Sequence, residues 1–306
     1  MVAGSEIVAW RPSVAGVSEV LHAHMTDHAY PMHTHAAWTL LIVDDGMVKY
    51  DLDRHEHGVL RRAVSLLPPH VPHNGSAATP TGFRKRVLYL DSSHVADDLI
   101  GRAVDHSVLD DHALHGRVHR LHTLLLRPGE ELEAESRLAF IAERLRGHLL
   151  GRVAAPTVVR DAGLAHRLRD LLDARFVEGV TLGAASELLY AHPTHLVRAF
   201  GREFGIGPHQ YLTGRRVDLA RALLLDGMPP HTVAVTAGFY DQSHLNRHFK
   251  RTLGISPGRF ARTGARLMTA ARPNARTAAT AATAANTTNT ANTAASTTAS
   301  TPGANG

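Results

Sequence analysis

The feature that most constrains the fold of this chain is an internal repeat of 17 residues, whose second copy follows the first after 49 positions. The first copy runs from His192 to Pro208, and the second runs from Asp241 to Pro257. Eight of the 17 positions are identical, and they include the pattern His-Leu-x-Arg-x-Phe and a closing Gly-Ile-x-Pro. A repeat at a fixed spacing indicates two copies of one structural unit.

Each copy has the pattern of a short amphipathic helix. In the second copy Asp241 is a good N-cap, and Leu245 and Phe249 are four residues apart, so that they share one face. Gly254 occupies the place of the left-handed residue that ends many helices, and Pro257 follows it. The remaining side chains are rich in hydrogen-bond donors, and we expect them to face away from the core.

A shorter helix is predicted before each copy, over residues 182–189 and 232–237, with a tight turn between the two helices. Two helices joined in this way form a helix-turn-helix unit, whose second helix enters the major groove of DNA. Residues 208–225, between the units, predict one helix of about 27 Å at 1.5 Å per residue. This helix would hold the units close to the separation of two successive major-groove segments, about 34 Å.

Basic charge is concentrated in the half of the chain that carries the repeat. Residues 164–262 hold 13 Lys and Arg against 8 Asp and Glu, whereas residues 1–163 hold 17 against 20. A basic region beside a mildly acidic one is typical of a nucleic-acid-binding module attached to a domain of another kind.

The composition argues against several other classes of protein. The chain has no cysteine, which excludes disulfide frameworks, thiolate zinc sites and a cysteine nucleophile. Its longest strongly apolar run is residues 40–43, against the roughly 20 residues of a membrane span, and no secretory signal is visible. The chain shows no phosphate-binding loop, nucleophile elbow or zinc-protease motif. We therefore expect no enzymatic activity, no membrane partner and a cytoplasmic location, on the nucleoid when DNA is bound.

The N-terminal half predicts short strands followed by helices. Apolar runs at residues 38–43 and 48–52 flank the turn Asp44-Asp45-Gly46 and predict a hairpin, and further strands are expected at 63–67 and 87–90. Such strands, separated by Pro and Gly, are typical of a small antiparallel barrel or sandwich. Leucines at helical spacing then predict a helical hairpin over 113–150 and a third amphipathic segment from Leu164 to Leu172.

On these residues, the stretch from about Leu164 to Arg262 resembles the DNA-binding domain of the AraC/XylS family of transcriptional regulators. The resemblance is carried by the run from Ala237 to Lys250 and by the closing Gly254-Ile-Ser-Pro257. The first unit departs from the family at Gly201, where Lys is usual, and at His192, where Ser is usual. The β-rich segment is similar to the cupin-like effector domain that precedes such DNA-binding domains, through motifs that include His33-Thr-His35 and His70-Val-Pro-His73.

The resemblance implies an α+β multi-domain chain, with a cupin-like β-barrel and helical hairpin before an all-α domain of two helix-turn-helix units joined by a linker helix. We expect four regions: a cupin-like effector-binding domain at 1–112, a helical dimerisation and linker region at 113–160, the double helix-turn-helix domain at 161–265, and a disordered Ala/Thr/Asn-rich tail at 266–306. Alternatively, the leucines of the second region belong to the internal core of the chain and do not form a dimer interface.

The same resemblance implies the residues that contact DNA. Base contacts are expected from Thr194, Val197 and Arg198 in the first unit and from Gln242, Ser243, Asn246 and Arg247 in the second. The chemistry fits, because Arg can bridge guanine O6 and N7 and Gln or Asn can bridge adenine. Phosphate contacts are expected from Arg202, Lys250 and Arg251. The alternative is that Arg198 and Arg247 make structural or phosphate contacts.

A small-molecule effector is expected in the barrel, bound by His33, His35, Trp38 and His73. Three of these match an H-x-H pair and a later His that bind a divalent ion in metal-using cupins, where a carboxylate follows the pair. Here Ala36-Ala37-Trp38-Thr39 follow His35, so the carboxylate is missing. We therefore expect neither a metal nor another cofactor, and polar lining or surface roles for the histidines.

These expectations favour a sequence-specific transcription regulator controlled by an unidentified small molecule. A homodimer is expected, and contact with RNA polymerase, as in activators of this family, is a further possible partnership. Two alternatives stay open: a constitutive or architectural DNA binder whose barrel only dimerises, and a metal-dependent cupin enzyme fused to a DNA-binding module.

Overall fold

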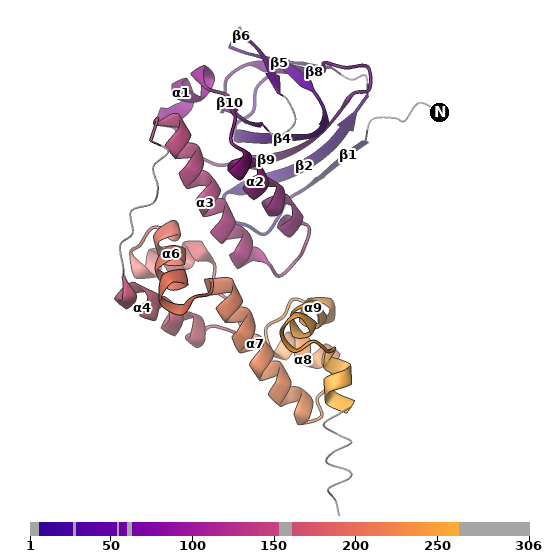
Figure 1. Ribbon diagram of the computed structural model, residues 1–306, viewed down its shortest axis with the longest axis vertical. Helices are drawn as coiled ribbons and strands as arrows, with labels where there is room; N and C mark the ends of the chain where they lie inside the picture. Colours follow the sequence, from indigo (N-terminus) through magenta and orange to yellow (C-terminus); the bar gives the residue numbers. More distant parts are fainter. Residues whose placement is uncertain (1–5, 27–28, 54, 60–62, 153–160, 263–306) are drawn as a thin grey trace, which may run out of the picture.

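The computed structural model describes residues 6–26, 29–53, 55–59, 63–152 and 161–262 (Figure 1). The tail predicted at 266–306 and the end of the linker region, at 153–160, lie outside these residues. Figure 1 shows a β-rich part that carries two helices against one face, and an all-helical part that follows it. In the described residues, no helix combines the length and the hydropathy that a membrane span requires.

Two antiparallel sheets form the N-terminal part. The first has the order β1 (Glu6–Trp10), β2 (Val17–Met25), β9 (Phe83–Leu90), β4 (Trp38–Gly46), β7 (Val64–Leu67) and β10 (Val108–Leu109). The second has the order β3 (Tyr30–His33), β8 (His73–Ala77), β5 (Val48–Leu52) and β6 (His55–Val59). Their inner faces share an apolar core that includes Leu41, Tyr50 and Val87. The predicted antiparallel β domain is confirmed.

The hairpin predicted from residues 38–52 is wrong. β4 pairs with β7 and β9 in the first sheet, whereas β5 pairs with β6 and β8 in the second. All of residues 38–43 are buried, as expected for a central strand that is covered on both faces, whereas exposure alternates along β5. The predicted turn continues β4 as far as Gly46 (φ 74°), after which the chain crosses to the other sheet.

Helices cover the outer face of the first sheet. A short 3₁₀ turn, η1 (Asp97–Leu99), leads into α1 (Ile100–Asp105), and α2 (His112–Leu125) and α3 (Glu131–Leu149) form the predicted helical hairpin. The leucines of α2 and α3 pack with Trp38, Leu40 and Ile42 of β4 in one apolar core. The apolar faces of this hairpin are therefore internal core, which was the alternative to a dimer interface.

The C-terminal part contains the two predicted helix-turn-helix units. The first comprises α5 (Leu182–Leu189) and α6 (Pro193–Phe204), supported by α4 (Ala162–Ala174). The second comprises α8 (Pro230–Thr236) and α9 (Gln242–Leu253), and α7 (Pro208–Leu225) joins the units. Asp241 caps α9 by accepting a hydrogen bond from the His244 N–H at 2.6 Å, and Gly254 ends the helix at φ 76°.

Asp111 ties the start of α2 to the end of α3. Its carboxylate accepts hydrogen bonds from the Leu114 N–H (2.9 Å), from His148 Nε2 (2.7 Å) and from the Arg144 guanidinium. Burial by itself would raise the pKa of Asp111, but the donors from Arg144, His148 and Leu114 hold it well below its usual range. The carboxylate therefore stabilises the hairpin only while it is ionised.

We expect Asp111→Ala to lower the free energy of unfolding at pH 7 by about 2–4 kcal/mol, from a lost N-cap and lost charge-assisted hydrogen bonds. Because folding depresses this pKa, the stabilisation is present above the unfolded pKa, near 4, and falls by about 1.4 kcal/mol for each pH unit below it. Denaturant unfolding at pH 7 and pH 3 measures the effect, with the exposed neighbour Asp110→Ala as control. An equal loss at both pH values would contradict this role.

Candidate nucleic-acid interface and ligand pocket

The second recognition helix presents most of its predicted DNA-contacting residues to solvent. Gln242, Ser243, Asn246 and Lys250 of α9 are exposed, as is Arg251, because Leu245 and Phe249 turn the opposite face of the helix into the core. The side chain of Arg247 is partly buried. This face of α9 could contact a major groove without rearrangement, apart from Arg247.

The first recognition helix is different, because α3 covers its predicted DNA-contacting face. α3 packs against α5, α6 and α7, and its Leu132 and Ala139 belong to the apolar core of the first unit. Thr194 is only 4% exposed, and its hydroxyl is paired with His192 Nδ1 at 2.9 Å. Val197 packs against the same core. The side chain of Arg202 is partly exposed.

Arg198, the central predicted base-contacting residue of α6, is bound to α3. Its guanidinium donates two hydrogen bonds to the Glu143 carboxylate, at 2.7 and 2.6 Å, in a bidentate ion pair. The Phe140 ring, one turn earlier on α3, lies 5.1 Å from the guanidinium carbon. Such planar recognition of a carboxylate is among the stronger arrangements available to Arg. The two terminal nitrogens of Arg198, which would bridge a guanine, are therefore engaged by Glu143 in this arrangement.

Arg247 occupies the equivalent position of the second unit and is also bound to α3. Its Nη2 donates at 3.0 Å to Oε1 of Glu130, the N-cap residue of that helix. The turn before α3 also packs closely against α9. A side chain at Gly129 would not fit there, because its Cβ would lie 2.3 Å from the His244 ring. Both arginines that the repeat makes equivalent thus pair with carboxylates of one helix.

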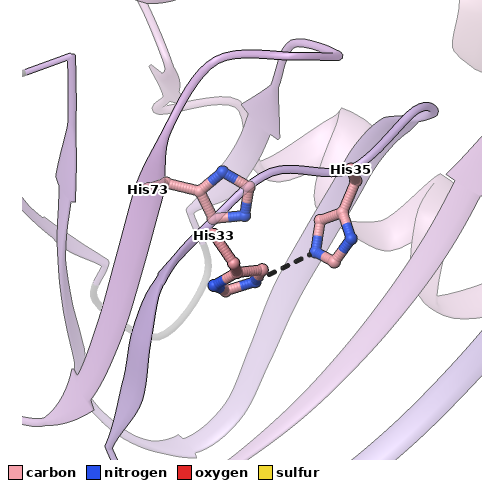
Figure 2. Close-up of side chains that lie close together, drawn as sticks. All are labelled: His33, His35 and His73. Atoms are coloured by element: carbon pink, nitrogen blue, oxygen red, sulfur yellow. Dashed lines mark hydrogen bonds between the residues drawn. The ribbon is translucent and has the colours of Figure 1, made fainter.

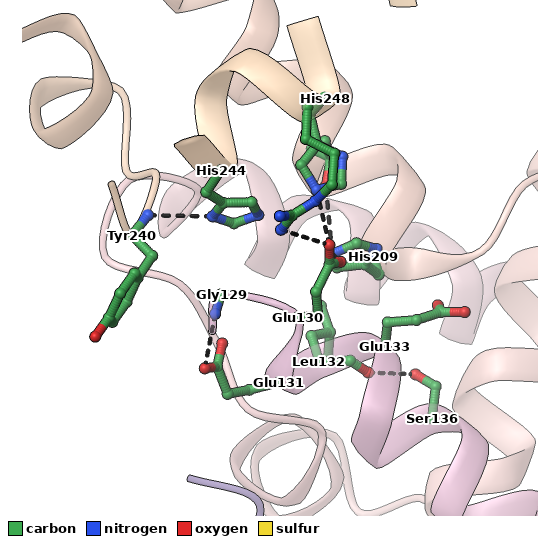
Figure 3. A network of polar contacts seen from close by, with 12 residues as sticks. Gly129, Glu130, Glu131, Leu132, Glu133, Ser136, His209, Tyr240, His244 and His248 are labelled. Carbon is green, nitrogen blue, oxygen red and sulfur yellow. Dashed lines mark hydrogen bonds and ion pairs between the residues drawn. The ribbon is translucent and has the colours of Figure 1, made fainter. Parts of the chain in front are cut away.

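Glu130 is the centre of a buried polar network. His248 Nε2 lies 3.0 Å from one carboxylate oxygen and His209 Nε2 lies 3.1 Å from the other (Figure 3). Burial alone would raise the pKa of Glu130, but His209 and His248 hold it far below its usual range. Glu130 is consequently an anion that links α3 to α7 and α9.

Glu130, His244 and His248 are close enough to hold a metal ion, but their bonding does not fit one. Their potential ligand atoms lie within 4.8 Å of one another. The Tyr240 N–H donates to His244 Nδ1, so a neutral His244 ring carries its proton on Nε2, the nitrogen that would otherwise coordinate. The Arg247 guanidinium also occupies the carboxylate. The network is therefore an ion-pair cluster.

A pocket opens between the two sheets of the N-terminal part. It holds about 580 Å³ of empty space, part of it open to solvent. His33, His35 and His73 line it, and their ring nitrogens lie within 4.8 Å of one another (Figure 2). Apolar side chains of both sheets and three tyrosines complete the wall: Leu21, Leu41, Val48, Leu67, Val87, Tyr30, Tyr50 and Tyr89. The structure thus brings together three of the four residues predicted to bind an effector.

Trp38, the fourth of these residues, lies elsewhere. Its ring is fully buried with Leu40 and Ile42 in the core under the helices, and its Nε1 donates to Asp97 at 3.3 Å. Neighbouring residues of a strand point to opposite faces, and Thr39 and Leu41 line the pocket. Trp38 therefore stabilises the core that joins the sheet to α2 and α3.

The backbone fixes which nitrogen of each pocket histidine carries a proton. His33 Nδ1 lies 2.7 Å from the Pro31 carbonyl and His73 Nδ1 lies 3.0 Å from the Val71 carbonyl, and a carbonyl can only accept. In the neutral rings, Nε2 is therefore an acceptor. Burial lowers the pKa of His73, and burial with the neighbouring histidines lowers the pKa of His35 to about 4. The positions of these nitrogens suit a metal ligand, but a lysine, Lys85, lines the same pocket, and none of the described residues that line it is Asp or Glu.

The sequence analysis missed two sets of residues. Lys85 lines the pocket because alternate side chains of β9 point into it. The sequence Phe83-Arg-Lys-Arg-Val87 shows this alternation only weakly, because its three central residues are all basic. Glu130 and Glu143 contact residues 117 and 55 positions away, and no local pattern could have indicated those contacts.

Comparisons with known proteins agree with this division of the chain. A family model described as AraC-like ligand binding domain matches residues 15–142, and a model described as helix-turn-helix domain matches residues 185–263. The uncharacterized HTH-type transcriptional regulator YbfI of Bacillus subtilis is 30% identical over 138 residues, 45% of this chain and 50% of that protein. The chain spans about half the length of the curated relatives it matches.

Two solved structures are similar. The C-terminal domain of AraT, a response regulator from Geobacillus stearothermophilus, is 31% identical, with a TM-score of 0.31, over 33% of this chain and 84% of that chain. The AraC-like transcriptional activator CuxR is 16% identical, with a TM-score of 0.40, over 72% of this chain and 81% of that chain.

Proposed function

This chain belongs to the AraC family of helix-turn-helix transcriptional regulators, a non-enzymatic family, and we propose that it binds DNA sequence-specifically under the control of a small molecule held in its N-terminal pocket. The observation that carries the proposal is the pairing of Arg198 with Glu143 and of Arg247 with Glu130. A ligand domain whose helix occupies both DNA-contacting arginines controls DNA binding directly. A constitutive DNA binder has no use for such contacts.

The two recognition helices supply the DNA contacts. In the second unit Gln242, Ser243, Asn246 and Arg247 contact bases, and Lys250 and Arg251 contact phosphates. In the first unit Arg198, Val197 and Thr194 contact bases once α3 has moved, and Arg202 contacts a phosphate. His192 already caps α6, since its Nδ1 accepts from the Thr194 N–H at 3.3 Å.

The path from ligand to DNA runs through α3. One face of this helix packs on the sheet through Leu138, Ile141 and Leu145, and another packs on the first helix-turn-helix unit. β4, which contacts α2, contributes Leu41 to the pocket and Leu40 to the core under the helices. A ligand that changes the spacing of the two sheets moves the surface on which α3 packs. Its effect on DNA affinity equals the difference between its own affinities for the DNA-free and the DNA-bound arrangements of the protein.

Two further partnerships stay predictions. A homodimer requires a surface other than the apolar faces of α2 and α3, which the sheet covers, and sedimentation at micromolar concentration tests it. Contact with RNA polymerase would make the protein an activator. The proposed DNA binding places the protein in the cytoplasm, on the nucleoid when DNA is bound.

In vitro selection of DNA by the full chain tests the proposed function. We expect a motif with two elements separated by about one helical turn, 10–10.5 base pairs, because α7 holds two recognition helices in tandem. We also expect log Kd to depend linearly on log salt, with an affinity for the motif at least about 10³-fold above that for random DNA. Salt-sensitive binding without an enriched motif would instead identify an architectural DNA binder.

A further inference from the structure

The pocket between the sheets contains a cation without a counter-charge. Lys85 points inward from β9, and its ammonium lies 4.0 Å from the centre of the Tyr30 ring. Among the described residues, no Asp or Glu lines the pocket, and burial is the one cause of the lowered pKa of Lys85, with no carboxylate opposing it. Burial lowers the pKa of Lys85 to about 8, so the side chain remains largely charged at neutral pH. A partly buried ammonium is costly unless an anion offsets its lost hydration.

The histidines on the other side of the pocket present acceptors. The Nδ1–H groups of His33 and His73 are committed to backbone carbonyls, so in the neutral rings the Nε2 atoms carry lone pairs. His33 Nε2 lies 3.3 Å from His35 Nε2, which can therefore act as its donor (Figure 2). His73 Nε2 is then left as an acceptor toward the pocket. A bound molecule completes this site by offering a hydrogen-bond donor.

From this arrangement we propose that the effector is a small organic anion that also carries a hydroxyl or N–H donor: the anionic group pairs with Lys85 and the donor bonds to His73. The apolar walls formed by Leu41, Val48 and Val87 accommodate a hydrocarbon part between these two groups. The inference rests on the proposed control by a small molecule and names the class of that molecule. It also accounts for the absence of Asp and Glu among the described residues of the pocket wall, because a carboxylate there would neutralise Lys85 and repel the ligand.

A matched set of probes tests this chemistry on the full chain. Mandelate has a carboxylate, a hydroxyl and an apolar ring; phenylacetate lacks the hydroxyl, and 1-phenyl-1,2-ethanediol lacks the carboxylate. In calorimetric titrations at millimolar probe, we expect mandelate to bind at least about tenfold more tightly than either partner, because each lacks one hydrogen bond to a charged or buried group. Equal binding of all three probes, or no binding of mandelate, would overturn the inference.

Two lysine variants locate the binding. Lys85→Met should weaken mandelate binding by at least about tenfold, since it removes the cation and keeps an unbranched side chain only one atom shorter. Lys49→Met is the control, because Lys49 lies on the exposed face of β5 and pairs with Glu56. Unchanged binding by Lys85→Met would exclude the anion site, and so would one zinc or nickel ion per chain retained through dialysis, because the metal would take the histidine nitrogens.

DNA binding distinguishes this inference from the proposed function. If mandelate binds through Lys85 but leaves the affinity for the selected motif unchanged, the pocket chemistry holds and control by this pocket fails. The other outcome is that the probes do not bind, although selection yields a DNA motif and release of the arginines from α3 strengthens DNA binding. In that case the proposed class of ligand is wrong and the proposed function stands.

Discussion

Arg247→Ala should reduce discrimination at one base pair of the selected motif by about 5- to 150-fold, corresponding to the roughly 1–3 kcal/mol of a bidentate Arg–guanine contact. The ratio between the preferred and substituted base pair is the quantity to measure, by fluorescence anisotropy on matched duplexes. This ratio is insensitive to the ion pair with Glu130, because the loss of that pair changes the affinity for every duplex alike. Arg198→Ala should affect one base pair of the other element in the same way.

The control for these substitutions is Arg221→Ala. Arg221 is an exposed arginine on α7 that, within the part of the chain that the structure describes, pairs with Asp218 of its own helix, at 3.4 Å. We expect it to leave base discrimination unchanged and to weaken binding at most slightly. If Arg247→Ala lowers affinity equally for all base pairs, Arg247 contacts phosphate, and the alternative considered for the two arginines is correct.

Glu143→Gln should strengthen DNA binding in the absence of any ligand. The substitution keeps the size of the side chain and removes the charge that holds Arg198, so the DNA-free arrangement loses about 1 kcal/mol, or about fivefold in Kd. With Glu130→Gln added, which also releases Arg247, the combined gain should approach the range of allosteric couplings, about 5- to 150-fold. Anisotropy titrations with the selected duplex measure both variants.

Glu133→Gln is a matched control on the same helix, because Glu133 pairs with Arg137 of α3, at 2.7 Å, and not with the helix-turn-helix units. Glu130 is buried with its partners, so circular dichroism must show that its variant is folded. The Glu143 side chain is 38% exposed, so the Glu143→Gln variant alone provides the test if Glu130→Gln unfolds. Equal or weaker DNA binding by folded Glu143→Gln would show that the Arg198–Glu143 pair does not restrain the protein.

The helical half of this molecule could be predicted closely because its signals are local. The repeat, the Asp241 cap and Gly254 specify α9 to within a residue of its observed bounds, and residues 182–189 and 208–225 form the expected helices α5 and α7. Each of these elements is set by side chains within one or two turns of one another, through capping, apolar spacing and a left-handed end.

The contacts that govern function could not be predicted in this way. The pairing of β4 with β7 and β9 depends on strands well beyond the neighbouring turn, so the adjacent run at 48–52 gave a plausible but wrong partner. Whether Trp38 faces the pocket or the helices depends on strand register, which shifts every side chain to the other face when it slips by one residue. The restraint of Arg198 depends on how α3 docks, which no pattern within either helix specifies.

The most direct test of this account is the distance between the helical hairpin and the first helix-turn-helix unit, measured with and without DNA. The chain has no cysteine, so Leu126→Cys and Leu188→Cys, both at exposed positions, provide two unique spin-label sites for pulsed electron double resonance. We predict one narrow distance distribution in the free protein and a shifted distribution with the selected duplex, because α3 must leave the face of α6 before Arg198 reaches a base. The same distribution in the free and DNA-bound protein would contradict the account.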